Sequence, residues 1–163
     1  MWVFLAGWLS QCGAMIRHAL IPIVLGLSLF SLPPGPAAAR EVIDIVNDSG
    51  GNVLQAIARR NQLQSSGKLV RIRGYCRSAC TLYLTLPNAC IGPQARVGFH
   101  APRVKGTSFI PPIVGDLMGQ HYRGEIRRRW YAEWQYSLQM HTMSAAQYKK
   151  LDPQIKFCWS NDG

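Results

Sequence analysis

GYCRSACTLYL, residues 74–84, holds a serine between two cysteines with an apolar run directly behind them. The overlapping LVRIRGY, residues 69–75, alternates apolar and polar residues, which is typical of a β-strand. SACTLYLTL, residues 78–86, is apolar almost all round, which predicts a buried helix that stops at the following Pro-Asn pair. The chain is therefore expected to pass from strand to buried helix at Ser78.

A strand and a helix are predicted before this junction. EVIDIV, residues 41–46, is apolar and β-branched, which predicts a buried strand, and it runs into the turn formers NDSGG. NVLQAIARRNQLQ, residues 52–64, has apolar residues at helical spacing and bases on the other side. Those apolar residues are Val53, Leu54, Ile57 and Leu63. Strand, glycine turn and helix thus precede the second strand.

The chain after the junction continues the alternation. ACIGPQARVGFHAP, residues 89–102, predicts two short strands around a Gly-Pro turn, and residues 112–141 follow a helical pattern. One stripe of that pattern, expected in the core or in an oligomer contact, contains Ile126, Trp130, Trp134 and Leu138. TMSAAQYKKLD, residues 142–152, predicts a last short helix capped by Thr142 or Ser144. The order predicts an α/β fold with a largely parallel sheet.

The first 39 residues are predicted to lie outside the folded domain. They contain no acid and form two apolar blocks separated by Arg17 and His18, followed by PPGP and three alanines. This pattern matches a secretory signal peptide cleaved between Ala39 and Arg40, and Met15 would give that signal a more regular start. A retained membrane anchor is the alternative, because the two blocks together are long enough to span a bilayer. Residues 40–163 are then a single domain.

The chain is strongly basic, with 18 Lys and Arg residues against 8 Asp and Glu residues and a net charge of +10. Its hydrophobic content of 48% and charged content of 16% are typical of globular domains and exclude wholesale disorder. The bases are spread along the chain, with one cluster at Arg127 to Arg129, which indicates a solvated surface or attraction to anionic lipids and cell-wall polymers. No nucleic-acid-binding motif accompanies the charge, so we expect no nucleic-acid partner.

Four cysteines remain after residue 39: Cys76, Cys80, Cys90 and Cys158. An even number in an exported chain indicates disulfides, and three pairings are open. A zinc site is the competing use, but Cys90 and Cys158 have no second ligand at the usual spacing, and His100 and His121 form no close pair. We therefore expect disulfides or buried thiols and no metal.

Two predicted helices begin at the same edge of the sheet. The first amides of a helix have no partner within it and can bind a developing oxyanion, so Gly51 and Ala79 would each offer one N–H group. Ser78 could project its hydroxyl toward them, and His100, at the end of an apolar strand, could supply the base that a serine nucleophile needs. The alternatives are that Ser78 only caps its helix, that His100 is structural and that the glycines only form a turn.

The order of these motifs resembles the Clp protease proteolytic subunit and crotonase superfamily from Ile43 to Pro102. DSGGN resembles the family's SPGGS, RSACTLYL its nucleophile turn and buried helix, and PQARVGFHAP the segment that carries its histidine. MSAAQY, residues 143–148, resembles a late helix of the family. CRSAC followed by GFHAP is similar to exported, uncharacterised proteins of this superfamily. The resemblance implies a spiral of ββα units with Ser78 as nucleophile, His100 as base, and the amides of Gly51 and Ala79 as oxyanion hole.

The chain departs from the family pattern at two points. The place of the family's triad aspartate falls at Met140, beside His141, so the candidates for orienting His100 are a backbone carbonyl or one of three distant acids. Those acids are Asp116, Glu133 and Asp152. The family also has further strands and helices before the glycine turn, so this domain is expected to be an N-terminally truncated version whose sheet edge must be covered, paired or charged.

Two functions follow from the resemblance. The first is an exported serine hydrolase of peptidase type, periplasmic or secreted, that acts on a peptide or protein and forms a homo-oligomer. The second is a non-catalytic relative that serves as a binding or assembly module at the cell envelope, with membrane contact only through an uncleaved N-terminal segment. An acyl-coenzyme A enzyme of crotonase type would share the oxyanion hole, but export disfavours that cofactor, and we expect none.

Overall fold

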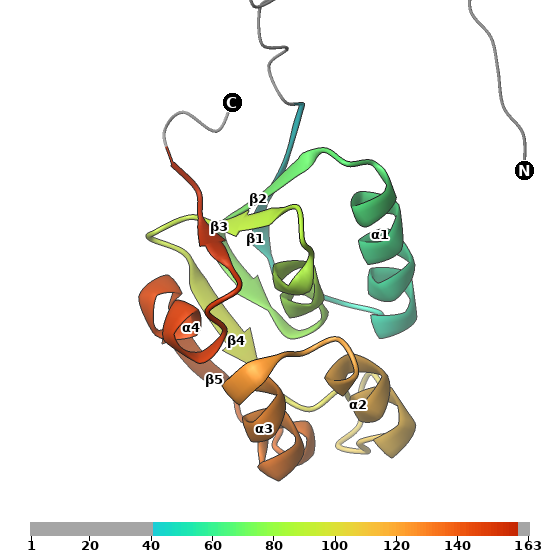
Figure 1. Ribbon diagram of the computed structural model, residues 1–163. Coiled ribbons are helices and arrows are strands. Elements are labelled where there is room, and N and C mark those ends of the chain that lie inside the picture. The colour runs from blue at the N-terminus through green and yellow to red at the C-terminus, as the bar shows by residue number, and fades with distance from the viewer. Residues whose placement is uncertain (1–40, 160–163) are drawn as a thin grey trace, which may run out of the picture. The chain divides into compact units, whose positions relative to one another are not determined.

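The computed structural model describes residues 41–159, and the predicted signal segment with its cleavage site lies outside the described residues. The described chain is an α/β domain (Figure 1), so the predicted class is confirmed. Its strands are β1 (Val42–Asp48), β2 (Leu69–Arg77), β3 (Ala89–Ile91), β4 (Arg96–Phe99), β5 (His141–Ser144) and β6 (Lys156–Phe157). Its helices are α1 (Val53–Ser65), α2 (Pro112–Gly119), α3 (Gly124–Ala132) and α4 (Ala145–Leu151), with 3₁₀ helices η1 (Ser78–Thr85) and η2 (Trp134–Tyr136).

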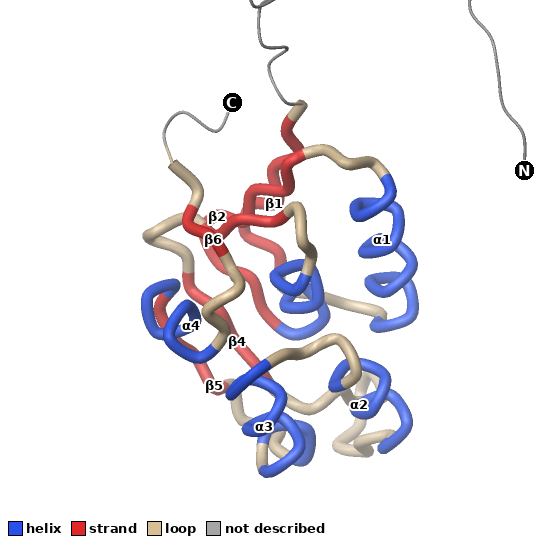
Figure 2. The backbone as a smooth tube through the Cα atoms, in the orientation of Figure 1, coloured by secondary structure: helices blue, strands red, loops and turns tan. Residues whose placement is uncertain are grey.

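β2 is the centre of one curled sheet (Figure 2). β1 pairs with β2 along one edge, while β3 pairs with the first half of the other edge and β4 with its second half. These pairings and that of β6 with β3 are parallel, whereas β5 runs antiparallel to β4. The sheet is therefore mixed.

The two faces of β2 differ in chemistry. Val70, Ile72 and Cys76 have no exposed surface, and η1 packs against the sheet on this buried side. Alternate residues turn the other way, and there Arg71 and Arg73 lie 2.9 and 3.1 Å from Asp44 of β1. The alternation of LVRIRGY thus separates a core face from a charged face, as a half-buried strand requires.

The predicted helix at residues 52–64 is confirmed as α1, which begins after Asn52. The Asn52 side chain accepts a hydrogen bond from the backbone N–H of Gln55 at 3.1 Å and caps the helix. Val53 and Leu63 are buried, but Leu54 is 62% exposed, so its expected place on the packed side is wrong. One turn at the start of α1 therefore presents an apolar side chain to solvent.

The prediction of one helical stretch at residues 112–141 is wrong. Gly119 ends α2, and a side chain there would meet Tyr131 at 2.6 Å, while Gly124 has a positive φ of 52° and begins α3. The chain folds back and packs α2 against α3, while α4 packs against β4 and β5 (Figure 1). Leu138 lies beyond η2 and is 42% exposed, so it leaves the predicted stripe. The other stripe residues, Ile126, Trp130 and Trp134, are buried in the core.

The last predicted helix begins later than expected because its first residues form β5. Thr142 pairs with Gly98 across the sheet, and Ser144 is the cap, with a capping box to Gln147. Of the two candidate caps, the structure selects Ser144.

The cysteines form two disulfides, Cys76–Cys80 and Cys90–Cys158. The second joins β3 to the residue that follows β6 and fixes the end of the described chain to the sheet. Such bonds favour an oxidising location outside the cytoplasm. Among residues 41–159, no helix is long and apolar enough to cross a membrane.

Candidate functional site

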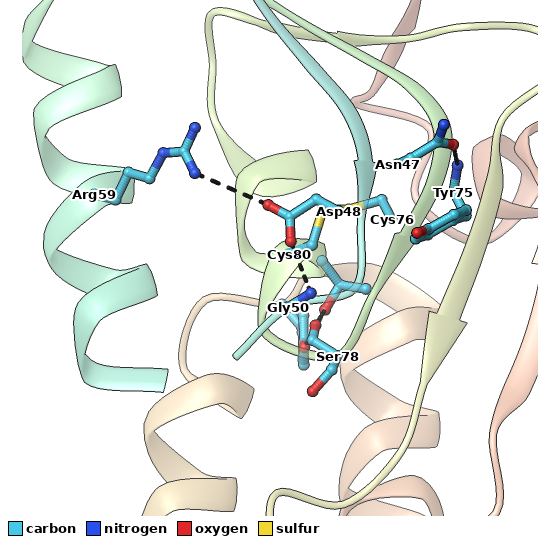
Figure 3. The surroundings of a disulfide bond; sticks show 10 residues. Asn47, Asp48, Gly50, Arg59, Tyr75, Cys76, Ser78 and Cys80 are labelled. Atoms are coloured by element: carbon cyan, nitrogen blue, oxygen red, sulfur yellow. Dashed lines mark hydrogen bonds and ion pairs between the residues drawn. A yellow bond between two sulfur atoms is a disulfide. The ribbon is translucent and has the colours of Figure 1, made fainter. Parts of the chain in front are cut away.

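The turn between β1 and α1 is shaped by Asp48. Its carboxylate oxygen Oδ1 accepts a hydrogen bond from the N–H of Gly50 at 2.7 Å, and its other oxygen lies 4.0 Å from Arg59 (Figure 3). Gly50 and Gly51 have φ values of 86° and 148°, which side chains disfavour. The Gly51 N–H group donates to no residue in the described part of the chain. The turn therefore exposes one free amide at the start of α1.

Ser78 has a φ of 53°, a left-handed conformation that is uncommon outside glycine. It is the first residue of η1, and the cap position is Arg77, so the interpretation of Ser78 as the helix cap is wrong. The Ser78 hydroxyl forms no hydrogen bond within residues 41–159. Figure 3 shows it pointing away from the Cys76–Cys80 disulfide that brackets it. Strained backbone conformations of this kind cluster at functional sites, and here the strained residue carries a free hydroxyl.

A buried relay holds the backbone of Ser78. Thr81 donates a hydrogen bond from its hydroxyl to the Ser78 carbonyl at 2.6 Å. Because the Thr81 hydroxyl proton is engaged in that bond, the Tyr122 hydroxyl is the donor to the Thr81 oxygen, at 2.7 Å. Burial raises the pKa of Tyr122 well above its ordinary value, so the phenol stays protonated and keeps its role as donor.

The glycine turn and the serine turn lie against each other. An ideal Cβ on Gly50 would lie 2.8 Å from the Ser78 Cβ and 2.7 Å from the backbone nitrogen of Ala79. The structure thus brings together the two turns that the sequence predicted to meet. Ala79 itself is fully buried.

His100 follows β4, and its ring is held by the backbone. Its Nδ1 lies 2.7 Å from the carbonyl oxygen of Ala101. A carbonyl only accepts hydrogen bonds, so Nδ1 carries the proton, and in the neutral ring Nε2 is left as acceptor and base.

None of the three candidate acids pairs with His100. Asp152 binds Arg123 at 2.7 Å, Glu133 lies 3.9 Å from His141, and Asp116 forms no ion pair with a described residue. Of the alternatives for orienting His100, the structure therefore has the backbone carbonyl.

One cavity of about 630 Å³ brings the predicted residues together. Gly51, Ser78 and His100 all line it, whereas Ala79 lies behind the Ser78 turn and is not among its lining residues. No hydrogen bond joins Ser78 to His100 within residues 41–159. Catalytic hydrogen bonds are often long in a free enzyme and shorten only around substrate.

Sequence analysis missed three residues that shape this site. Asp48 had a usable signal, since an aspartate two residues before a glycine favours a local side-chain turn. Thr81 and Tyr122 had none, because they are 41 residues apart and meet only in the folded chain. Residues 41–159 contain no group of three or more His, Cys, Asp or Glu side chains that could hold a metal ion.

The fold and the cavity define a class: a disulfide-bonded α/β domain with a serine and a histidine in one cleft. No protein-family model matches the chain, and a search of curated proteins finds no match. The assignment of a function therefore depends on the geometry of the cleft.

Proposed function

We propose that the protein is an exported serine hydrolase of peptidase type with a Clp protease/crotonase-like fold. Ser78 is the nucleophile, His100 is the general base, and the amides of Gly51 and Ala79 bind the oxyanion. The observation that carries the proposal is that a serine with a positive φ and a free hydroxyl shares a cavity with a histidine whose Nδ1 is anchored. Both turns lie in contact, as an oxyanion hole built from two chain segments requires.

The reaction is a two-step acyl transfer. His100 Nε2 takes the proton of the Ser78 hydroxyl as its oxygen attacks the carbonyl carbon, and the carbonyl electrons move to an oxyanion held by backbone N–H groups. The intermediate collapses when the bond to the leaving amine breaks and His100 returns the proton to that amine. Water then attacks the acyl-serine with His100 again as base, which releases the acid and restores Ser78.

A carbonyl in the place of the triad acid supports modest turnover. It fixes the tautomer and the orientation of His100, which are two roles of the usual aspartate, but it supplies no full negative charge to stabilise the imidazolium. We expect a slower enzyme than one with a complete triad.

A non-catalytic binding module is the second candidate. The observation that favours it is that Ser78 and His100 are not hydrogen-bonded to each other, and that no acid contacts His100 within residues 41–159. This candidate predicts a cleft that binds ligand without forming an acyl-enzyme.

Labelling with a fluorophosphonate probe separates the two candidates. We expect the purified protein to be labelled, Ser78→Ala to lose all labelling, and His100→Gln to label at least tenfold more slowly. Ser49→Ala is the matched control, because Ser49 lines the same cavity. Labelling that persists in Ser78→Ala, or its absence from the native protein, would contradict the hydrolase.

We also propose a homo-oligomer. Among the described strands β1 pairs only with β2, so its outer edge is open to another strand. Light scattering of the purified protein should give a mass above that of one chain, and a monomer at all concentrations would contradict this expectation.

A further inference from the structure

We infer that the cavity beside Ser78 takes an acyl group with an apolar side chain and a nearby carboxylate, as in a peptide with an acidic residue next to an apolar one. This inference rests on the proposed function, since it names the substrate of the same site. Two properties of the cavity wall, neither of which takes part in the proposed catalytic steps, support it.

The first property is an apolar wall. Leu54 at the start of α1, Val104 in the loop between β4 and α2, and Val114 of α2 all line the cavity together with Pro111. Leu54 and Val104 are 62% and 46% exposed, which leaves apolar surface at the cleft uncovered. Burying such surface against a leucine-sized group is worth a roughly tenfold preference over a group that lacks it.

The second property is unbalanced positive charge. Arg103 and Lys105 line the cavity, and no acidic side chain does. Arg103 reaches only the carbonyl oxygen of Thr107 at 3.5 Å, and Lys105 has no partner within residues 41–159.

The acids of the described chain are engaged elsewhere. Five of them are paired with Lys or Arg, namely Glu41, Asp44, Asp48, Glu125 and Asp152, and a sixth, Glu133, lies 3.9 Å from His141. The seventh, Asp116, does not line the cavity. A carboxylate on the ligand would therefore supply the negative charge that no described acid gives to Arg103 and Lys105. Low-polarity walls strengthen that attraction.

The combination selects one ligand chemistry. A ligand with only an apolar group would leave both cations without a charge partner. A ligand with only an anionic group would leave the apolar wall exposed to water. A peptide carbonyl flanked by an apolar side chain and a carboxylate satisfies both, while it presents its reacting carbon to Ser78.

Thioester substrates that differ in one group test the inference. We compare N-succinyl-leucine thiobenzyl ester, which carries a carboxylate, with its N-acetyl counterpart and with N-succinyl-glycine thiobenzyl ester. At low salt we expect kcat/KM for succinyl-leucine to exceed that of succinyl-glycine about tenfold and that of acetyl-leucine about fivefold. The advantage over acetyl-leucine should shrink as salt is raised.

Variants assign the effect to the two cations. The double variant Arg103→Gln with Lys105→Gln should lose the preference for succinyl over acetyl while it keeps the preference for leucine over glycine. Arg96→Gln with Lys156→Gln is the matched control, because it removes the same charge from exposed residues outside the cavity. Equal rates for succinyl-leucine and acetyl-leucine in the native protein would overturn the inference and leave the hydrolase in place.

A binding measurement without turnover distinguishes a failure of the ligand class from a failure of the proposed hydrolase. Ser78→Ala is titrated with N-succinyl-leucinamide and N-acetyl-leucinamide and followed by nuclear magnetic resonance shifts of residues that line the cavity. Tighter binding of the succinyl compound, with no turnover of any ester by the native protein, would support the ligand class and contradict the hydrolase. If the succinyl and acetyl compounds bind equally or not at all, and the native protein turns over no ester, both the ligand class and the hydrolase would be overturned.

Discussion

Gly50 lies directly against Ser78, so that even one added carbon on Gly50 would come within 2.8 Å of the serine Cβ and 2.6 Å of the carbonyl oxygen of Arg77. The conformation of each turn therefore depends on the other. The glycine between β1 and α1 and the strained serine between β2 and η1 therefore form one structural unit.

Gly50→Ala should disturb both turns. The new methyl group meets backbone atoms that cannot move aside, and the φ of 86° disfavours any side chain, so we expect a loss of about 2–4 kcal/mol in the free energy of unfolding. Gly67→Ala is the control, because Gly67 has a φ of 65° but an added Cβ there would meet no atom within 4 Å. It should lose only about 1 kcal/mol. Urea unfolding of both variants measures the difference, and equal losses would contradict the contact.

The relay from Tyr122 through Thr81 should position Ser78. Thr81→Val removes the donor to the Ser78 carbonyl, and we expect it to lower fluorophosphonate labelling at least tenfold and to reduce stability by about 1–3 kcal/mol. Thr81→Ser keeps the hydroxyl and should label at nearly the native rate. A valine variant that labels at the native rate would contradict the role of this hydrogen bond, because valine keeps the methyl group of Thr81 and lacks only the hydroxyl.

The two disulfides should contribute differently. Cys90–Cys158 closes a loop with a sequence separation of 68, whereas Cys76–Cys80 has a separation of 4. Chain entropy then gives about 4 kcal/mol for the first and about 2 kcal/mol for the second. We expect Cys90→Ala with Cys158→Ala to unfold at lower urea but to keep labelling at Ser78 while folded. Cys76→Ala with Cys80→Ala should lose less stability and more labelling; the reverse ranking would contradict a local role beside Ser78.

Asp152 should be structural and take no part in catalysis. It is 1% exposed, is bound by Arg123 at 2.7 Å and accepts a weaker bond from Tyr148 at 3.4 Å. Asp152→Asn should reduce the free energy of unfolding by about 2–4 kcal/mol, because it leaves Arg123 without its charge partner.

Asp44→Asn provides the matched control for that substitution. It breaks a more exposed pair on the open face of the sheet and should cost at most about 1 kcal/mol. An Asp152→Asn protein that is as stable as the native one but fails to label would contradict the structural role.

His121 should make the fold sensitive to mild acid. Burial, and then the neighbouring Arg60, lower the pKa of His121 below its ordinary 6.5. The unfolded chain therefore binds the proton first, so stability is complete above that value and falls as the pH drops from 6.5 toward the lowered pKa of the folded state. Urea unfolding at about pH 7.5 and about pH 5.5 should show a smaller decrease for His121→Gln than for the native protein. An identical decrease would contradict this assignment.

Local patterns predicted the elements that are specified by neighbouring residues. The alternation in LVRIRGY identified β2, helical spacing after Asn52 identified α1, and the capping pair of Ser144 and Gln147 lies within one turn. Patterns failed where contacts between distant residues matter. Gly119 lies against Tyr131 at the end of α2, and residues 141–144 form a strand that pairs with β4.

The sequence by itself determined that a glycine turn, a serine turn and a histidine-bearing strand follow one another, because turn chemistry and hydrophobic period are local properties. Only the tertiary structure decided which cysteines pair, that a carbonyl anchors His100, and that Gly50 meets Ser78. Each of these is a contact whose partner is set by how the strands are arranged in the sheet. Residue spacing alone does not encode that arrangement, since the same order of turns permits several geometries.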